Sequence, residues 1–238
     1  MRRLLLLLTL GASACAPHAI GPALTGTFTG REMVVALAAG DVDAYAPAAG
    51  EAPTKYTVEA DVAPAMLKVR ARANALVVCA PGCTPAESQR PVNVLIRVPH
   101  GVRAVLSSRT GTVTATDVNG PVEAETVDGD IRIQVPSYAD AHAVRGNVSV
   151  TFGDAEWPGT LHIRADRGDA TVYVPATANG RLDLHTEAGT IFTDFNLRGT
   201  SQGSSETIVG PIGAGGNRTV EVRVGYGNIR VLRLTPQM

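Results

Sequence analysis

One short motif recurs along the chain and limits what it can fold into. Each copy is a glycine, a small polar residue, and then an apolar–polar–apolar triplet. The copies begin at Gly40, Gly111, Gly129, Gly146, Gly168, Gly189 and Gly227. From Gly111 onward the spacings are 18, 17, 22, 21 and 38 residues, and the last is close to two units. Self-similarity at such a period indicates stacked structural repeats, because one small unit cannot bury its apolar face alone.

The motif has a direct physical interpretation. The glycine permits a positive φ at a sharp corner, and the Asp, Asn or Thr that follows can bond to the turned backbone. The second and fourth residues after each glycine, such as Ile131 and Ile133, then point inward together. Small branched aliphatics suit a narrow core between strands stacked about 4.8 Å apart. We therefore predict an all-β fold, a β-solenoid-like stack of short strands with Gly-Asp/Asn corners and two strands per coil.

An antiparallel β-sandwich is the alternative fold, because turn signals every 8–12 residues also fit that class. The repeat favours the solenoid, since a sandwich has no reason to repeat one corner sequence in the same phase. We predict one β-repeat domain over residues 31–238. Residues 31–100 would hold the N-terminal strands with a cysteine hairpin, and residues 101–238 the regular repeats.

The first residues have the order of a secretory signal. Arg2 and Arg3 precede a short apolar segment, Leu4–Leu10, and small residues then lead to Cys15. This segment is too short to span a bilayer. Either a signal peptidase cuts after Ala14, or Ala12–Cys15 resembles a lipobox and Cys15 becomes a lipidated first residue. We predict a signal peptide over residues 1–14, lipidation of Cys15, a tether over residues 15–30, and attachment to a membrane of the cell envelope through the lipid.

The other two cysteines, Cys79 and Cys83, flank a Pro-Gly turn. Residues paired across adjacent strands are close enough for a disulfide, and an exported location supplies the oxidising conditions. A metal site would need further Cys or His nearby, and the segment has none. We predict a Cys79–Cys83 disulfide.

The chain resembles a bacterial domain family of unknown function that carries the name "putative adhesin". The likeness rests on the corner motifs, on Val98-Pro99 followed by Gly101, and on Gly40-Asp41-Val42, and it covers roughly Leu24 to Leu234. The resemblance implies an envelope-associated β-solenoid-like repeat domain without assigned catalysis. No functional residue is carried over, because the family pattern is structural.

Composition limits the partners. Basic and acidic residues number 21 and 22 and are interspersed, whereas binding to nucleic-acid phosphates needs concentrated Lys and Arg. Aromatic residues make up 4%, too few for the stacking platforms of typical sugar or base binders. We expect no nucleic-acid partner and no cofactor, and we expect a protein or a cell-wall polysaccharide as partner.

Two ladders of polar residues have an ordinary and a functional interpretation. His142 and His185 share one repeat position with Arg164 between them, which favours a solvated face over a metal site. Asp130, Asn147, Asp169 and Asn228 share the position after the corner glycine. Turn hydrogen bonding explains this second ladder better than calcium binding, because the spacing of calcium-binding repeats is absent.

Catalysis has weak support in the sequence. Glu123 and Glu125 share one strand face, and Asp128 and Asp130 flank a corner, but no nucleophile elbow, phosphate loop or zinc motif occurs. Trp157, near Phe152, either caps the core or contacts a partner. We therefore predict that the protein is not an enzyme but a non-catalytic, envelope-anchored module for surface interaction or adhesion-like scaffolding. The alternative is a β-helical polysaccharide-processing enzyme.

Overall fold

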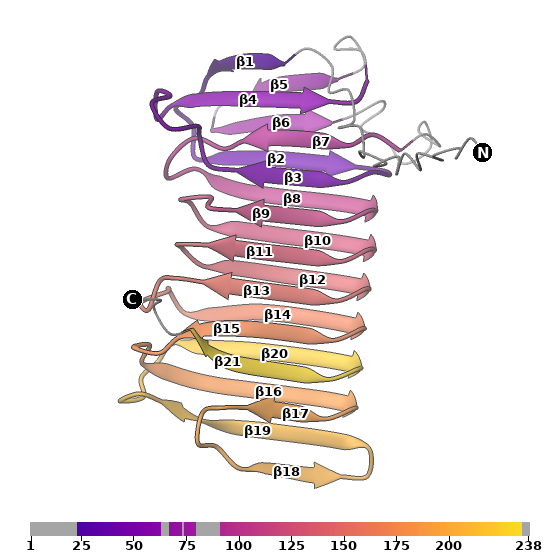
Figure 1. Ribbon diagram of the computed structural model, residues 1–238, viewed down its shortest axis with the longest axis vertical. Helices are drawn as coiled ribbons and strands as arrows, with labels where there is room; N and C mark the ends of the chain where they lie inside the picture. The colour runs from indigo at the N-terminus through magenta and orange to yellow at the C-terminus, as the bar shows by residue number, and fades with distance from the viewer. Residues whose placement is uncertain (1–22, 63–66, 73, 80–90, 235–238) are drawn as a thin grey trace, which may run out of the picture.

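The computed structural model describes residues 23–62, 67–72, 74–79 and 91–234. These residues form 21 strands in two large sheets, so the predicted all-β class is confirmed. Figure 1 shows the strands stacked in a column, with β1 and β4 near one end and β18 and β19 at the other. Within the described ranges, no helix has the length and apolarity needed to cross a bilayer.

The ten-stranded sheet is called sheet A. Its strands, in spatial order, are β1 (Leu24–Thr27), β4 (Lys55–Ala60), β7 (Val94–Arg97), β3 (Val42–Tyr45), β9 (Val113–Thr116), β11 (Ile131–Val135), β13 (Val148–Phe152), β15 (Ala170–Pro175), β21 (Ile229–Leu234) and β17 (Ile191–Thr193).

The eleven-stranded sheet is called sheet B. Its strands, in spatial order, are β18 (Gly199–Gln202), β19 (Ser205–Ile212), β16 (Gly180–Ala188), β20 (Thr219–Tyr226), β14 (Thr160–Arg167), β12 (Ala139–Arg145), β10 (Val122–Asp128), β8 (Arg103–Thr110), β2 (Glu32–Leu37), β6 (Ala75–Cys79) and β5 (Lys68–Arg72).

Each regular coil is one strand of sheet B, a glycine corner, and one strand of sheet A. From β8 to β15 all neighbours pair in parallel, with Ile131 of β11, for example, opposite Val113 and Val148. Parallel in-register stacking is the solenoid arrangement and excludes an antiparallel sandwich. Antiparallel pairs occur toward the ends of the column, between β1, β4 and β7, between β5 and β6, and between β16, β19 and β18.

The order of the coils in space differs from their order in the chain. The last coil, β20–β21, lies between β14–β15 and β16–β17, and Figure 1 shows these yellow strands among orange ones. The coil β2–β3 likewise lies between β8–β9 and β6–β7. The 38-residue spacing between Gly189 and Gly227 does not contain an additional stacked coil. Its extra residues form β18 and β19, which are an antiparallel cap beside β16.

The core is one continuous cluster of mostly aliphatic side chains between the two sheets. All the inward positions predicted beside the corners are buried except Thr193, which is half-buried. Trp157 is fully buried against Phe152, with their rings edge to face, and its Nε1 donates to the carbonyl of Thr219 at 3.2 Å. Trp157 is thus a core residue, and it bonds to the first residue of β20 in the coil β20–β21. The prediction that it contacts a partner is wrong.

The N-terminal predictions are only partly covered by the structure. Residues 1–14, Cys15 and Cys83 lie outside the described residues, so the signal, the lipid and the disulfide stay predictions. Cys79 ends β6 and is buried. The predicted tether over residues 15–30 is too long, because Leu24–Thr27 form β1, which pairs with β4, and Phe28 is buried.

The seven corner glycines all have positive φ, from 113° at Gly40 to 157° at Gly189. They also leave no room for a side chain. A Cβ on Gly129 would lie 2.0 Å from the carbonyl oxygen of Gly111, and one on Gly146 would lie 1.9 Å from that of Gly129. The same contact recurs through Gly168 and Gly227 to Gly189. The predicted corners are confirmed, and both φ and close backbone approach require glycine.

Replacing a corner glycine should therefore cost more than backbone strain alone. We expect Gly129→Ala to lower the free energy of unfolding by at least about 3 kcal/mol, because the new methyl group must displace backbone. Gly159→Ala is the matched control. Gly159 also has positive φ (66°), but its Cβ position is open, so the loss should be about 1–2 kcal/mol. Denaturant unfolding measures both, and equal losses would show that the corner contact does not constrain the fold.

Candidate functional site

Four positions in each repeat place side chains on the outer surface of sheet B. They lie six, four, two and one residues before the corner glycine. Because the strands pair in parallel and in register, equivalent side chains of successive coils form rows along the column. The outward side chains of β10, β12, β14, β20 and β16 are here called the charged face.

Two of these rows have opposite character. The acidic row, six residues before each corner, contains Glu123, Asp140, His162, Glu221 and Asp183 in spatial order. The cationic row, four residues before each corner, contains Glu125, His142, Arg164, Arg223 and His185. Carboxylates and guanidinium groups therefore lie side by side on neighbouring rows.

Most of these charges are paired within the face. Arg223 bridges the acidic row, at 3.0 Å from Glu221 and 2.9 Å from Asp183. Arg164 donates to Asp166 at 2.6 Å. Arg145 pairs with Asp128, and Arg103 with Glu123. Each pair is partly solvent-exposed and contributes little stability by itself, so the network mainly orders the long side chains.

Two carboxylates differ in their environments. Burial raises the pKa of Asp140 above its ordinary value, and the hydrogen bond from the backbone N–H of His162, 2.6 Å long, offsets part of this effect. At Asp166, burial also acts to raise the pKa. The hydrogen bond and charge of Arg164 outweigh burial and, with a smaller effect of His142, hold the pKa of Asp166 below its ordinary value. Burial therefore favours the protonated form of Asp140, whereas the contact with Arg164 favours the ionised form of Asp166.

The face is hollowed by two shallow grooves. One has a volume of about 500 Å³ and is lined by residues of the acidic and cationic rows together with Arg103 of β8. The other, about 650 Å³, lies toward the corners and includes Arg145, Arg167, His185 and Tyr226. Arg164, Glu221 and Arg223 line both, so the grooves adjoin.

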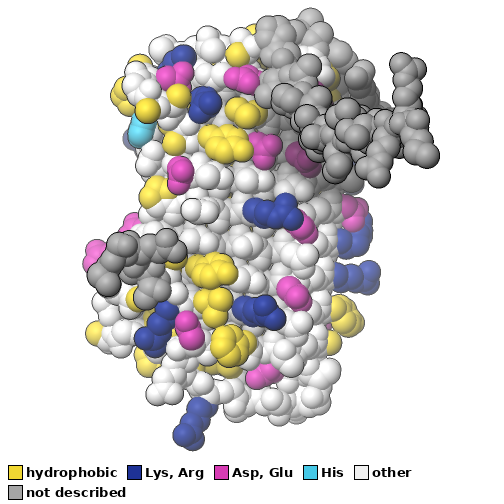
Figure 2. Space-filling model, in the orientation of Figure 1, with side chains coloured by type: hydrophobic (Ala, Val, Ile, Leu, Met, Phe, Trp, Pro, Cys, Tyr) yellow, Lys and Arg dark blue, Asp and Glu magenta, His cyan; other side chains and the backbone are white. Residues whose placement is uncertain are grey.

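The outer surface of sheet A has a different composition. Most of its central side chains are uncharged and small or medium-sized, namely Thr114, Thr116, Gln134, Ser149, Thr151 and Thr171. Figure 2 views the molecule from this side and shows only scattered charged side chains over the middle of the column. The charge is thus concentrated on one of the two broad faces.

The histidine ladder is confirmed as a row but does not form a metal centre. Arg164 and also Arg223, from the inserted β20, separate His142 from His185. His142 Nε2 lies 3.5 Å from Asp166, and His185 Nδ1 lies 2.8 Å from the hydroxyl of Thr207. Among the residues that the structure describes, no group of three or more His, Cys, Asp or Glu could hold a metal ion.

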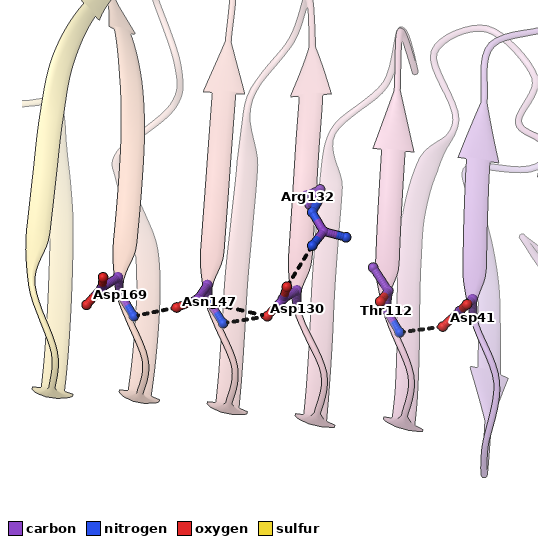
Figure 3. Close-up of polar contacts among 6 residues, drawn as sticks. All are labelled: Asp41, Thr112, Asp130, Arg132, Asn147 and Asp169. Carbon is purple, nitrogen blue, oxygen red and sulfur yellow. Dashed lines mark hydrogen bonds and ion pairs between the residues drawn. The ribbon is translucent and has the colours of Figure 1, made fainter.

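The Asp and Asn side chains that follow the corner glycines, here called the corner ladder, accept hydrogen bonds from backbone N–H groups (Figure 3). The N–H of Asn147 donates to Asp130 at 2.9 Å, and that of Asp169 donates to Asn147 at 2.9 Å. The N–H of Asn228 continues the ladder to Asp169 at 2.7 Å. These oxygens are therefore already used as acceptors, as expected for corner hydrogen bonding.

Carboxylates never occupy two successive steps of this corner ladder. In spatial order its members are Asp61, Asn93, Asp41, Thr112, Asp130, Asn147, Asp169, Asn228 and Thr190. A neutral acceptor or donor between carboxylates avoids stacking like charges at strand spacing, where each repulsion costs about 1 kcal/mol.

The four acids considered for hydrolysis do not converge. Glu123 is paired with Arg103, and Asp128 is paired with Arg145. Asp130 belongs to the corner ladder rather than to the charged face, and pairs with Arg132 at 2.7 Å. Glu125 lines the smaller groove without an ion pair in the described part of the chain.

Sequence reasoning missed several residues of the face, including Asp140, Asp183, Glu221 and Arg223. The signal that finds them is the repeat itself. Counting six and four residues back from the corner glycines Gly129, Gly146, Gly168, Gly189 and Gly227 gives both rows in full. What the count does not give is their order, because Arg223 and Glu221 enter the rows only through the insertion of β20.

No known protein family matches the sequence, and no curated protein matches it either. The fold is similar to a solved "putative cell adhesion protein" from Clostridium sporogenes, with 12% identity, coverage of 90% of this chain and 99% of that chain, and a TM-score of 0.47. It is also similar to a "putative adhesin" from Bacteroides fragilis, with 10% identity, 88% and 96% coverage, and a TM-score of 0.31.

A third similar structure, from Parabacteroides distasonis, is named a "putative lipid binding protein", with 9% identity, 90% and 96% coverage, and a TM-score of 0.29.

The corner ladder gives a pH-dependent prediction. Asn147→Asp keeps the acceptor oxygen but places three carboxylates in succession, so we expect a loss of about 2 kcal/mol at pH 7. Like-charge neighbours raise the carboxyl pKa in the folded state, so this loss is present above the raised pKa and disappears as pH falls through it. Asn147→Ala is the control and should lose about 1 kcal/mol at both pH values. Urea unfolding at pH 7 and pH 4 measures this, and a loss for Asn147→Asp that does not change with pH would contradict the repulsion.

Proposed function

We propose that the protein is a non-catalytic, adhesion-like module of the bacterial envelope that binds envelope material through the charged face of sheet B. The observation that carries this proposal is the long-range order of the face. Acidic and cationic rows run across five stacked strands, on a backbone fixed by glycine corners. Such a surface is suited to an extended partner, which can contact several coils at once.

The arrangement of the acids supports binding over catalysis. A general acid or base must be free to reach a reacting atom. Here Arg103 holds Glu123, and Arg223 holds Glu221 and Asp183. Glu123 and Glu221 line open, shallow grooves. The partner would exchange these partly solvated side-chain contacts for its own polar contacts.

The proposed location rests on the sequence. An export signal over residues 1–14 and lipidation of Cys15 would hold the protein at a membrane. A Cys79–Cys83 disulfide would form in the same oxidising compartment and close the end of β6.

A labelling experiment tests the anchor. In bacterial cells fed a fatty-acid analogue, the full chain should incorporate label and fractionate with membranes. Cys15→Ser should remain unlabelled and be released in soluble form, because no other cysteine follows a signal-like segment. Equal labelling of both chains, or labelling of neither, would reject the anchor.

A co-sedimentation experiment tests the binding face, using the Cys15→Ser chain so that a lipid contributes nothing. We expect it to sediment with envelope fragments, and Arg164→Ser with Arg223→Ser to weaken this about 10-fold or more. The matched control is Arg132→Ser with Arg230→Ser on sheet A, which should change binding less than about 2-fold. Equal binding of both double variants would place the interaction elsewhere.

The second candidate function is a polysaccharide-processing enzyme, and the raised pKa of Asp140 beside Glu123 favours it. The same experiment separates the two. A hydrolase would release soluble sugar from the fragments, and Asp140→Asn would abolish the release. A binding module would release none, whether residue 140 is Asp or Asn.

A further inference from the structure

The larger groove on the charged face lies over Gly225 of β20, a position that has no side chain. Two residues before each corner, neighbouring coils carry Asp166 and Glu187, but β20 carries Gly225 there. A Cβ on Gly225 would lie 2.5 Å from the carbonyl oxygen of Asp166, so no larger residue fits. The missing side chain creates the hollow between the neighbouring side chains.

Three side chains around this hollow are not engaged with the protein. Arg167 of β14 and Glu187 of β16 lie on the two sides of β20, and neither side chain has a hydrogen bond or ion pair within the described ranges. Tyr226, next to Gly225, is 62% exposed. A charged donor, a charged acceptor and an aromatic ring thus line one hollow with unused binding capacity.

The charges of the hollow are close to balanced, because its arginines face Asp166, Glu187 and Glu221 and one of them, Arg145, is paired with Asp128 outside the lining. Of the four arginines that line it, Arg145, Arg164 and Arg223 are paired with carboxylates. Among the residues that the structure describes, Arg167 and Glu187, on opposite sides of β20, have no ion pair. A strongly anionic ligand would meet Asp166, Glu187 and Glu221 as well as the arginines. A ligand that both donates and accepts hydrogen bonds without net charge meets no such repulsion.

We propose that this hollow binds a neutral polysaccharide strand. Sugar hydroxyls donate to Glu187 and accept from Arg167, because a hydroxyl does both at once. The exposed ring of Tyr226 packs against the apolar face of a sugar ring, with its hydroxyl left in water. The groove, about 650 Å³ and continuous with the smaller one, gives an extended chain room to follow the rows. This inference rests on the proposed function and names the chemistry of its partner.

The test is affinity electrophoresis of the Cys15→Ser chain in native gels containing glycol chitin, dextran or laminarin, which are neutral, or alginate, which is anionic. We expect retardation by at least one neutral polymer. Binding of labelled fragments of that polymer, measured by fluorescence anisotropy, should change less than about 2-fold between low and high salt, because screening acts on charge–charge attraction.

Matched variants locate the site. Tyr226→Ala should weaken binding about 10-fold, whereas Phe192→Ala should change it less than about 2-fold. Phe192 is exposed to a similar extent, 58%, but lies on sheet A. Arg167→Gln and Glu187→Gln should each weaken binding about 5-fold. All four side chains are exposed or lie at the surface, so thermal unfolding should remain unchanged and confirm that each variant folds.

The outcomes separate this inference from the proposed function. Failure of all three neutral polymers, or equal effects of Tyr226→Ala and Phe192→Ala, would overturn the polysaccharide site even if envelope fragments still sediment with the protein. Retardation by alginate alone, lost at high salt, would show that the arginines bind an anionic polymer and would also overturn it. If the Cys15→Ser chain does not sediment with envelope fragments at all, the proposed function itself is wrong.

Discussion

The structure depends on a steric contact that recurs at every corner, where the backbone of one coil occupies the space in which the next would place a side chain. A Cβ would lie about 2 Å from a carbonyl oxygen at Gly111, Gly129 and Gly168 alike. Only glycine permits both this approach and the positive φ. Backbone hydrogen bonds set the distance between coils, and glycine at the corners permits that distance. The stacked corners hold the strands on either side in register, and a one-residue slip would turn the aliphatic core outward.

The chemistry of the surfaces follows from that register. A fixed phase places Asp130, Asn147 and Asp169 above one another at the corners, where each oxygen accepts the next backbone N–H. The same phase aligns His142, Arg164 and Arg223 on sheet B, while the outer surface of sheet A carries hydroxyls and amides. A rigid column with one charged and one largely uncharged face can present ordered rows of polar groups to a long polymer, without an enclosed pocket.

Stacking in register leaves open edges at both ends of the column, and an antiparallel cap protects the end that β16 and β17 form. β19 and β18 continue sheet B beyond β16, and Ile208, Ile212 and Phe195 cover the core there. The backbone N–H of Ile191 on β17, the edge strand of sheet A, is bonded by Glu206 of the cap at 2.8 Å. Because the cap is attached to the β16–β17 coil, that coil must be terminal, and the last coil must enter the column on its inner side.

The sequence by itself determined the class of fold, the position of each corner and the direction of the side chains, because a glycine and an alternation of period 2 are local signals. Val148 and Val150 are buried as their spacing from Gly146 predicts, and the histidine row lies on the outer surface. Only the tertiary structure decided which coil lies beside which. Coils with the same corner and the same alternation can stack on one another equally well, so the motif does not distinguish the Gly189 coil from the Gly227 coil as the neighbour of Gly168. The cap, and the contacts of Trp157 with Thr219 and Arg218, decide that order. The same contacts place Gly225 and Tyr226 of β20 between Arg167 of β14 and Glu187 of β16. These residues are distant in the sequence and come together only in the folded protein.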